Sequence, residues 1–433
     1  MKQNNILPSA AIALLSVVCL SSCSHEDAEF NKDLYRYYIQ STYPVDTLES
    51  DHPWTLLRRY WVSVTADIND TGIRELRLYD ADPSLGAESQ LLVQSDITPG
   101  NTATVAYDLA QTSHGTLYAA LVTRDGPTYY APFTVGQDSL TITRGRARRL
   151  EYMPSTSLQT FTYLYESSFP VADDFDYNDL VLRISRQAPR SNQLQITVTL
   201  SAAGCRKQVA AGIRLPGVSY DQVERVNILE DEPFDDGFPY MYKKMDTKGN
   251  IVRDRNGEAV IRLFEDAHWS LKKELDVMGS VEYIPYNTGV PTAEGTPDTL
   301  TTLPELTRTY YVFLRDGANA DSLRLADLDP FVIESNNSIQ FEVHTYKYKF
   351  QESIWQFMAD DKAAYDDFLA WALIIPDGKF RYSLEEMPLG TYRDGELFGS
   401  YGLLNHSFGQ WARNYQTSYD WWMHPNEALV YGD

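Results

Sequence analysis

The residues best suited to chemistry in this 433-residue chain lie in one acidic stretch, residues 172–181, which reads ADDFDYNDLV. Hard cations such as Ca²⁺ bind about six to eight oxygen ligands, and oxygen-bearing side chains at alternate positions of a tight loop can turn inward together. Asp174, Asp176 and Asn178 have this spacing. Together with Asp179, and with Glu166 at the end of the preceding predicted strand, they form the predicted ligand set for a structural Ca²⁺.

A second interpretation of this stretch stays open. The loop is not an EF-hand, because the sixth position counted from Asp174 is Asp179, where that loop needs Gly, and the twelfth is Ser185, where it needs Glu. Asp and Asn also fix turns by accepting backbone hydrogen bonds, and Asp179 is suited to cap the turn into the next strand. The sequence therefore predicts either a cation site or a solvated turn.

The region that carries this loop, residues 155–433, is expected to form a larger antiparallel β-sandwich or jelly-roll-like domain with a few short helices. The runs that read as strands are 161–166, 180–184, 194–200, 209–215, 310–314 and 339–346. Hairpin turns are expected at 246–250 and 254–258. Helical spacing is found at 267–275, at 362–372 and in a last turn around 406–413.

Residues 51–150 are expected to form an N-terminal immunoglobulin-like β-sandwich, so that the fold class is mainly β. Short strand-like runs lie at 61–66, 75–79, 103–107, 117–122, 128–133 and 140–143, with turn sequences between them. Several short strands at this spacing are typical of such a sandwich. The basic run 144–149 that follows is expected to be a strand edge or a linker between the two domains.

The first 22 residues resemble a bacterial lipoprotein signal peptide. A short apolar run from Ile6 to Leu20 follows Lys2, and Leu20-Ser21-Ser22-Cys23 matches the lipobox. The resemblance implies cleavage before Cys23, whose thiol then carries a diacylglycerol inserted in the outer-membrane lipid, with residues 23–50 as a tether.

The acidic run after the predicted lipid anchor, residues 24–29, bears on localisation. It resembles the signals that send some Gram-negative lipoproteins to the cell surface. We therefore expect an outer-membrane, lipid-anchored protein that is exposed at the cell surface. A simple solvated tether is the alternative.

Composition excludes one class of partner. The chain has 60 acidic and 37 basic side chains, for a formal net charge of −23. Binding to a nucleic-acid backbone needs clustered Lys and Arg, so no nucleic-acid partner is expected. Removal of the signal peptide and lipidation of Cys23 leave Cys205 alone, so no intramolecular disulfide is expected either.

Aromatic residues are the other excess, with 30 Tyr and 8 Trp. Exposed aromatic faces stack on sugars and anchor protein interfaces, whereas buried ones fill cores. Trp421, Trp422 and Tyr419 are a candidate platform for a glycan or protein ligand. Packing in the core is the alternative for the same residues.

The sequence favours a non-enzymatic binding, adhesion or structural role. It has no nucleophile elbow, zinc-ligand pattern, phosphate loop or dinucleotide fingerprint, and no catalytic residue is assigned. A catalytic site built on Asp266 and His268 would need His344 and His406 to converge with them. We expect instead that Asp266 caps a helix and that His268 is a partly buried imidazole. The alternative is a carbohydrate-active hydrolase that uses paired carboxylates of the second domain.

Several motifs of the second region resemble the LruC-type domain of bacterial outer-membrane lipoproteins. The signature lies in Tyr165-Glu166, Phe169-Pro170 and residues 174–181. The stretches that agree further along are LFEDAH at 263–268, Asn287-Thr288, DPF at 329–331, EVH at 342–344, ALIIP at 372–376, FGQWA at 408–412 and DWW at 420–422. Residues 345–349 depart from the pattern. The resemblance implies placement at the cell surface and supplies no reaction.

Overall fold

The structure is a computed structural model. It describes residues 52–167, 174–228, 241, 244–245, 251–252, 257–274, 283–291, 301–315, 317–336, 339–345, 370–393 and 396–432. The predicted signal peptide, Cys23 and the tether lie outside these residues. Within the described ranges, no helix is both long and apolar enough to cross a membrane.

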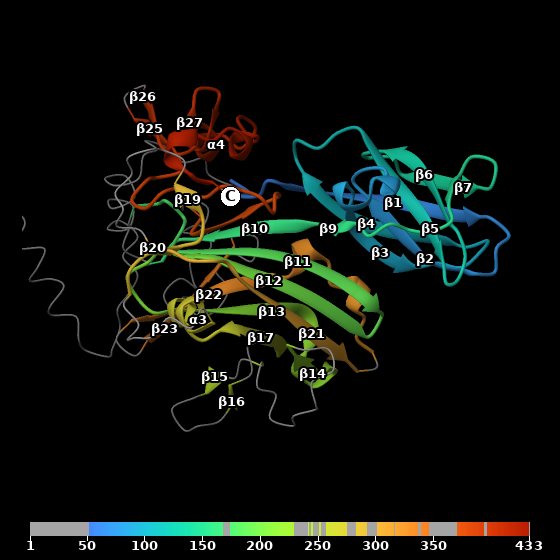
Figure 1. The fold of residues 1–433 in the computed structure, drawn as a ribbon, viewed down its shortest axis with the longest axis horizontal. Coiled ribbons are helices and arrows are strands. Elements are labelled where there is room, and N and C mark those ends of the chain that lie inside the picture. The colour runs from blue at the N-terminus through green and yellow to red at the C-terminus, as the bar shows by residue number, and fades with distance from the viewer. Residues whose placement is uncertain are drawn as a thin grey trace, which may run out of the picture.

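The first domain is a β-sandwich, shown in blue to teal in Figure 1. One sheet has the order β4 (Thr102–Ala110), β1 (Leu57–Asp67), β7 (Ser139–Thr143). The other has the order β8 (Arg148–Leu150), β6 (Thr128–Thr134), β5 (Thr116–Thr123), β2 (Ile73–Tyr79), β3 (Gln90–Asp96), β9 (Ser157–Leu158). Alternate residues of β1, Val62, Val64 and Ala66, are fully buried between the sheets. All six strands expected in this region are present, because apolar residues of period two give each strand one buried face.

The second domain is a larger and mainly antiparallel sandwich, so the expected mainly β fold class is confirmed. Its first sheet has the order β14 (Val223–Asn227), β21 (Leu306–Leu314), β12 (Gln193–Ala203), β11 (Leu180–Arg190), β10 (Thr160–Tyr165), β24 (Ala372–Ile375), and the short β18 (Tyr286–Asn287) and β20 (Thr301–Thr302) extend it. Its second sheet has the order β17 (Glu258–Phe264), β13 (Val209–Ser219), β22 (Asp329–Asn336), β23 (Ile339–His344). Leu182 of one sheet and Ile213 of the other belong to the same buried core.

The helical expectations have different outcomes. Helix α3 (Ala267–Glu274) and helix α4 (Phe408–Arg413) are confirmed. The expected helix 362–372 lies mostly outside the described residues, and its last residue, Ala372, begins strand β24 instead. The expected turn 246–250 also lies outside them, but its flanks, β15 (Lys244–Met245) and β16 (Ile251–Val252), pair as antiparallel strands.

Two short segments near the ends of the first sandwich contact the other one. His52 and Trp54, which were assigned to the first domain, lie against the second, where the His52 ring contacts Trp411 and its Nε2 lies 2.9 Å from the Trp411 carbonyl oxygen. Conversely, β9 was assigned to the second domain but pairs in parallel with β3 of the first. The chain therefore enters the second core before it builds the first sandwich.

Polar contacts join the two sandwiches beside β9 and β10, which run between them in Figure 1. Arg59 of β1 forms ion pairs with Asp108 at 2.9 Å and with Asp327 of the second domain at 2.7 Å. Gln159 donates a hydrogen bond to the Asp108 carbonyl oxygen at 2.8 Å. Only 7 % of the Asp108 side chain is exposed, so this junction is a specific contact and not a loose linker.

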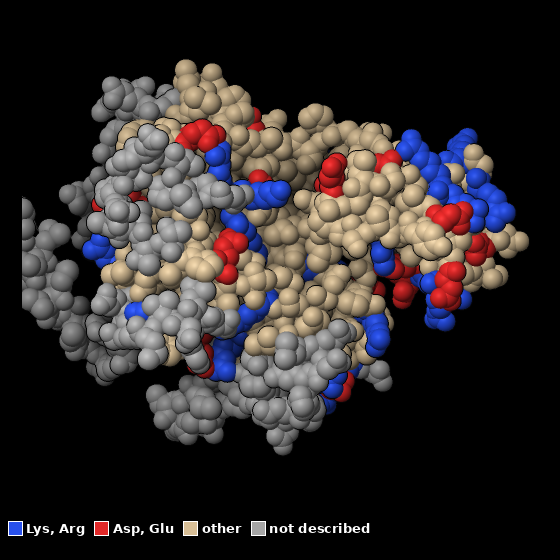
Figure 2. Space-filling view, viewed as in Figure 1, with Lys and Arg blue, Asp and Glu red and all other residues tan. Residues whose placement is uncertain are grey.

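The basic run 144–149 begins in a turn and ends in β8, the edge strand of the six-stranded sheet, as the strand-edge interpretation predicted. Arg148 pairs with Asp82 at 2.6 Å and Arg149 with Glu151 at 3.1 Å. Figure 2 shows basic side chains gathered at the end of the first sandwich that points away from the second. Charged residues on a sheet edge discourage pairing with another chain.

An aromatic cluster forms the core beneath the C-terminal segments. The Trp421 ring is fully buried and meets the rings of Tyr401, Phe408 and Trp411 at centroid distances of 5.2, 5.1 and 6.0 Å. Trp422 is partly buried against the same core. The candidate ligand platform is therefore wrong for Trp421, whose faces are covered by other rings, whereas Tyr419 is 40 % exposed and Trp422 is partly exposed.

Trp421→Ala is expected to lower the free energy of unfolding by about 3–5 kcal/mol, because it leaves a cavity among packed rings. Urea unfolding of the full chain measures the change. Trp61→Ala is the control, since Trp61 is 57 % exposed on β1, and should change stability by less than about 0.5 kcal/mol. Equal effects of the two substitutions would contradict the core assignment.

Candidate metal centre

The acidic loop connects the antiparallel strands β10 and β11, and its aromatic residues anchor it. Phe175 and Tyr177 have left-handed backbone angles, with φ of 55° and 57°, and both side chains are buried. Phe175 packs against Trp371, and the Tyr177 hydroxyl donates a hydrogen bond to the Ala370 carbonyl oxygen at 2.6 Å. This costly backbone conformation is held by the packing of the two rings. The alternate residues, Asp174, Asp176 and Asn178, are thereby directed away from the aromatic core.

Three of the predicted ligands converge. One oxygen from each of Glu166, Asp174 and Asp176 lies within 4.8 Å of the other two. The Glu166 side chain is fully buried, and Asp176 is 2 % exposed. These distances are short enough for a single ion to contact all three carboxylates, since Ca²⁺ lies about 2.3–2.6 Å from each ligand oxygen.

Backbone N–H groups hold these carboxylates in place. Tyr177 N–H donates to Glu166 Oε1 at 2.7 Å, and Asn178 N–H donates to Asp176 Oδ1 at 2.9 Å. The second Asp176 oxygen accepts from the Glu386 N–H at 2.9 Å. The bond from Asn178 is the Asx turn that the alternative interpretation predicted. The turn and the convergence of carboxylates therefore coexist.

Asp179 has the capping role that the sequence allowed. Its Oδ2 accepts a short hydrogen bond from the Ser167 N–H, on the other side of the loop. Asp179 is 8 % exposed and adds negative charge close to Glu166. It closes the loop and is not one of the three converging carboxylates.

Among residues 166–167 and 174–179, two buried acceptor oxygens have no hydrogen-bond donor, Glu166 Oε2 and Asn178 Oδ1, and the buried Ser167 hydroxyl has no partner either. The Asn178 amide is oriented by its nitrogen, which donates to the Ser383 carbonyl oxygen at 3.1 Å. A buried acceptor without a donor costs about 1–3 kcal/mol, and more when it is charged. A bound cation would remove this cost, so the residues present fit a hard metal ion.

Gly204 is required beside this amide. A Cβ atom at position 204 would lie 2.1 Å from Asn178 Oδ1 and 2.7 Å from the Asn178 carbonyl oxygen. The Gly204 N–H donates to that same carbonyl oxygen at 3.1 Å. The connection between β12 and β13 (residues 204–208) therefore approaches the loop so closely that only glycine fits.

The electrostatics of the loop oppose ionisation in the absence of a cation. Burial, and then repulsion from Asp179, Asp176 and Asp174, raise the pKa of Glu166 well above its usual value. Burial, and then repulsion from Asp174, Glu385 and Asp179, likewise raise the pKa of Asp176. Like charges this close cannot all ionise cheaply in a buried site.

Sequence reasoning missed Glu385, which the fold brings to the same cluster from more than 200 residues away. Burial raises its pKa to about 8, although the Asn287 amide donates to its Oε1 at 2.9 Å. Asn287 had been noted only as part of a family pattern. No local spacing links positions 287 and 385 to the loop, so only the tertiary structure shows the connection.

The other titratable residues singled out in the sequence do not form one site. Asp266 caps α3 by accepting from the Trp269 N–H at 2.9 Å, as expected. His268, which was expected to be partly buried, is fully buried, with its Nε2 2.8 Å from the Cys205 carbonyl oxygen. His344 lies between Asp329 and Glu342. Although burial works against protonation, these two carboxylates raise the pKa of His344 to about 9.

Comparison with known proteins places the chain in a family. A model for a domain of unknown function, DUF4842, matches residues 192–422, more than half of the sequence. The chain belongs to the DUF4842 family. The match includes Asn287 and Glu385 but begins after the acidic loop. It does not test the resemblance to the LruC-type domain, which stays a prediction.

Other comparisons add less about this DUF4842 protein. No curated protein matches the sequence significantly. Among solved structures, the crystal structure of a "putative lipoprotein" from Bacteroides ovatus is 14 % identical, with a TM-score of 0.44, and the alignment covers 83 % of this chain and 99 % of that one. A likeness of this degree carries no argument about function.

The raised carboxyl pKa values predict how stability depends on pH without metal. A carboxyl group with a raised pKa in the folded state binds its proton more tightly when folded, so its stabilising contribution is lost as pH rises through the folded pKa. In excess EGTA, the melting temperature should therefore fall between about pH 5 and pH 8, the window between the ordinary pKa of 4.5 and the raised pKa of about 8 for Glu385.

Differential scanning calorimetry of two variants separates this effect from general charge repulsion. Glu385→Gln should flatten the fall in melting temperature, because it removes one titrating group of the cluster. Glu88→Gln changes the net charge equally at an exposed position and should leave the slope unchanged. A steep slope that persists in Glu385→Gln would contradict the assignment.

Proposed function

We propose that this DUF4842 protein is a lipid-anchored protein of the bacterial cell envelope whose second sandwich is completed by Ca²⁺ at the acidic loop, and that it works by binding or adhesion and not by catalysis. The observation that carries the metal assignment is the buried Glu166 Oε2, which has no hydrogen-bond donor and belongs to a carboxylate that converges with those of Asp174 and Asp176. The lipobox ending at Cys23 supports the anchor.

Donor chemistry favours Ca²⁺ over other metals. The four candidate ligands, Glu166, Asp174, Asp176 and Asn178, offer oxygen only, and oxygen donors select hard cations. Ca²⁺ accepts about six to eight ligands in flexible geometry, whereas Mg²⁺ keeps several waters and rarely occupies an all-protein site. A divalent ion would also offset the repulsion among these carboxylates.

The ion would stabilise the contact between the acidic loop and residues 383–389. Asp176 accepts from Glu386, and the Leu389 N–H donates to the Phe175 carbonyl oxygen at 3.2 Å, so residues 383–389 close over the loop. These residues lead into the C-terminal segments that contain Trp421. A cation in the loop would therefore stabilise the surface formed by those segments, where we place the glycan or protein ligand.

The burial of the loop weighs against hydrolysis as its function. Glycosidases place two carboxylates on either side of a substrate bond in an open site. Glu166 and Asp176 are buried, and backbone N–H groups occupy oxygens of both. Burial and these hydrogen bonds keep the two carboxylates from reaching a sugar, which supports binding over the carbohydrate-active hydrolase.

Calcium titration tests the metal assignment. Full chain stripped with EGTA should bind one Ca²⁺ in calorimetry and rise in melting temperature, with a gain of about 2.7 kcal/mol when free Ca²⁺ is 100 times Kd. Asp176→Asn should abolish both effects. The matched control is Asp70→Asn, because Asp70 also forms an Asx turn, accepting from the Gly72 N–H at 2.9 Å, but in the first sandwich. Absence of heat and of stabilisation in the unaltered chain would contradict the proposal.

Labelling and fractionation test the anchor. In cells fed a tagged fatty acid, the unaltered chain should carry the label and sediment with outer membranes, and protease added to intact cells should remove it. Cys23→Ala should lose the label and the membrane association, while Cys205→Ala, which alters a buried thiol, should keep both. A label that persists in Cys23→Ala would contradict lipidation, and protection from protease would contradict surface exposure.

A further inference from the structure

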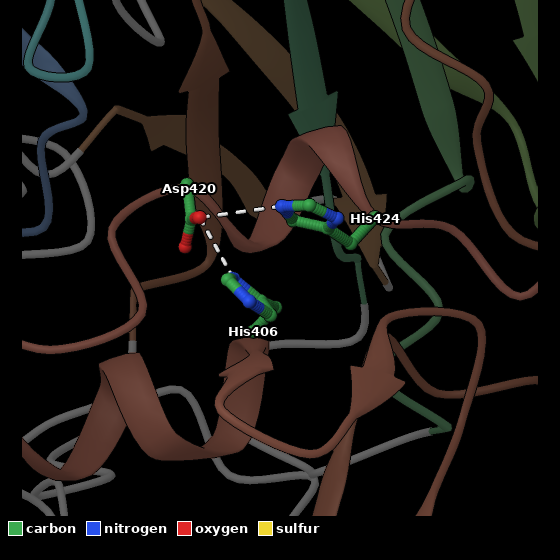
Figure 3. Close-up of side chains that lie close together, drawn as sticks. All are labelled: His406, Asp420 and His424. Carbon is green, nitrogen blue, oxygen red and sulfur yellow. Dashed lines mark hydrogen bonds and ion pairs between the residues drawn. The ribbon is translucent and has the colours of Figure 1, made fainter.

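Two histidines and one aspartate gather on the C-terminal segments, away from the acidic loop in sequence (Figure 3). They are His406, Asp420 and His424, and each offers a ligand atom within 4.8 Å of the other two. We propose that these three side chains bind a transition-metal ion of the Zn²⁺ class. The site is separate from the proposed calcium loop and uses different chemistry.

The three side chains share one oxygen atom. His406 Nδ1 lies 2.7 Å and His424 Nε2 lies 3.2 Å from the same Asp420 Oδ2, and the two imidazole rings lie 4.1 Å apart between centroids. In a tetrahedral Zn²⁺ site with metal–ligand distances near 2.1 Å, neighbouring ligand atoms are about 3.4 Å apart. To admit the ion, His424 Nε2 needs to move about 0.2 Å and His406 Nδ1 about 0.7 Å further from Asp420 Oδ2.

The backbone fixes the ligands before any ion binds. Asp420 and His424 flank the short 3₁₀ helix η8 (Trp421–Met423), whose Trp421 side chain is fully buried in the aromatic cluster. Within this turn the Met423 N–H donates to the Asp420 carbonyl oxygen at 2.9 Å, and the His424 N–H donates to the Trp421 carbonyl oxygen at 3.0 Å. Asp420 and His424 thus stand on a rigid support, which preserves affinity.

The third ligand is tied to that support by a separate contact. His406 begins the short strand β28 (His406–Ser407), which pairs with β27 (Gly402–Leu403) and leads into α4. The Ser418 hydroxyl donates to the Asn405 carbonyl oxygen at 2.9 Å, and both residues have left-handed backbones, with φ of 49° and 68°. This bond holds the segment of His406 against the segment of Asp420.

The donor set selects the metal. Two imidazole nitrogens and one carboxylate oxygen are typical ligands of Zn²⁺ and neighbouring transition metals, whereas Ca²⁺ and Mg²⁺ take oxygen. The side chains of His406, Asp420 and His424 are 38, 27 and 35 % exposed, so the ion can enter from solvent and keep water in a fourth position.

Zn²⁺ titration of the purified full chain tests the site, with Co²⁺ absorption as a second readout of coordination. One equivalent should bind, and bound Co²⁺ should show the strong visible bands of four-coordinate geometry. His424→Gln and His406→Gln should each weaken Zn²⁺ binding by more than about 100-fold, since loss of a mere outer-shell partner costs about 10–100-fold. Circular dichroism confirms that these half-exposed variants fold.

Two controls locate the ion. His114→Gln, at an exposed histidine of the first sandwich, should leave Zn²⁺ affinity unchanged. Asp176→Asn should also leave it unchanged, which separates this site from the proposed calcium loop. Absence of binding in the unaltered chain, or unchanged affinity in His424→Gln, would overturn the proposal. Loss of Zn²⁺ binding in Asp176→Asn alone would place the ion in the acidic loop and overturn it as well.

Discussion

The stability of the second domain depends on how the cost of its buried carboxylates is offset. Glu166 is fully buried and Asp176 nearly so, and the charges that weigh most on both are other carboxylates. Burial of like charges is among the most expensive arrangements in a protein unless they are protonated, paired or bound to a metal. Backbone N–H groups satisfy part of the demand, and two oxygens remain without donors. A cation bound among these carboxylates, as we propose, would offset the cost of burying them.

This constraint joins parts of the chain that are distant in sequence. The loop sits between β10 and β11, Gly204 closes on it from the β12–β13 connection, and residues 383–389 cover it. The segments that follow carry the aromatic cluster, and the first described residues, His52 and Trp54, pack against Trp411 of that cluster. In the sequence, the first sandwich therefore lies between residues 52–54 and the second domain, which pack together. The ion pair of Arg59 with Asp327 joins the first sandwich to the second domain.

The sequence predicted those features that arise from local spacing. Period-two runs such as 61–66 and 194–200 became strands because one buried face per strand is enough to define them. The alternate acids at 174 and 176 converge as expected, since their spacing sets their direction once the rings of Phe175 and Tyr177 enter the core.

Features that arise from tertiary contact were not predictable in this way. Glu385 joins the acidic cluster, and His424 joins His406, through folding alone. The sequence allowed Trp421 to be either an exposed ligand platform or a core residue. Its burial depends on rings contributed by residues 401 to 411. The contact of His52 and Trp54 with the second core is also tertiary, because the short segment 52–56 has no periodicity that could reveal its partner.

A crystal structure of the full chain grown with Ca²⁺ tests the central claim most directly. The account predicts an ion, identified by its anomalous signal, at about 2.3–2.6 Å from oxygens of Glu166, Asp174 and Asp176, with the Asn178 amide oxygen in the same shell. Density for water alone at that position, with the carboxylates bridged by shared protons, would contradict it.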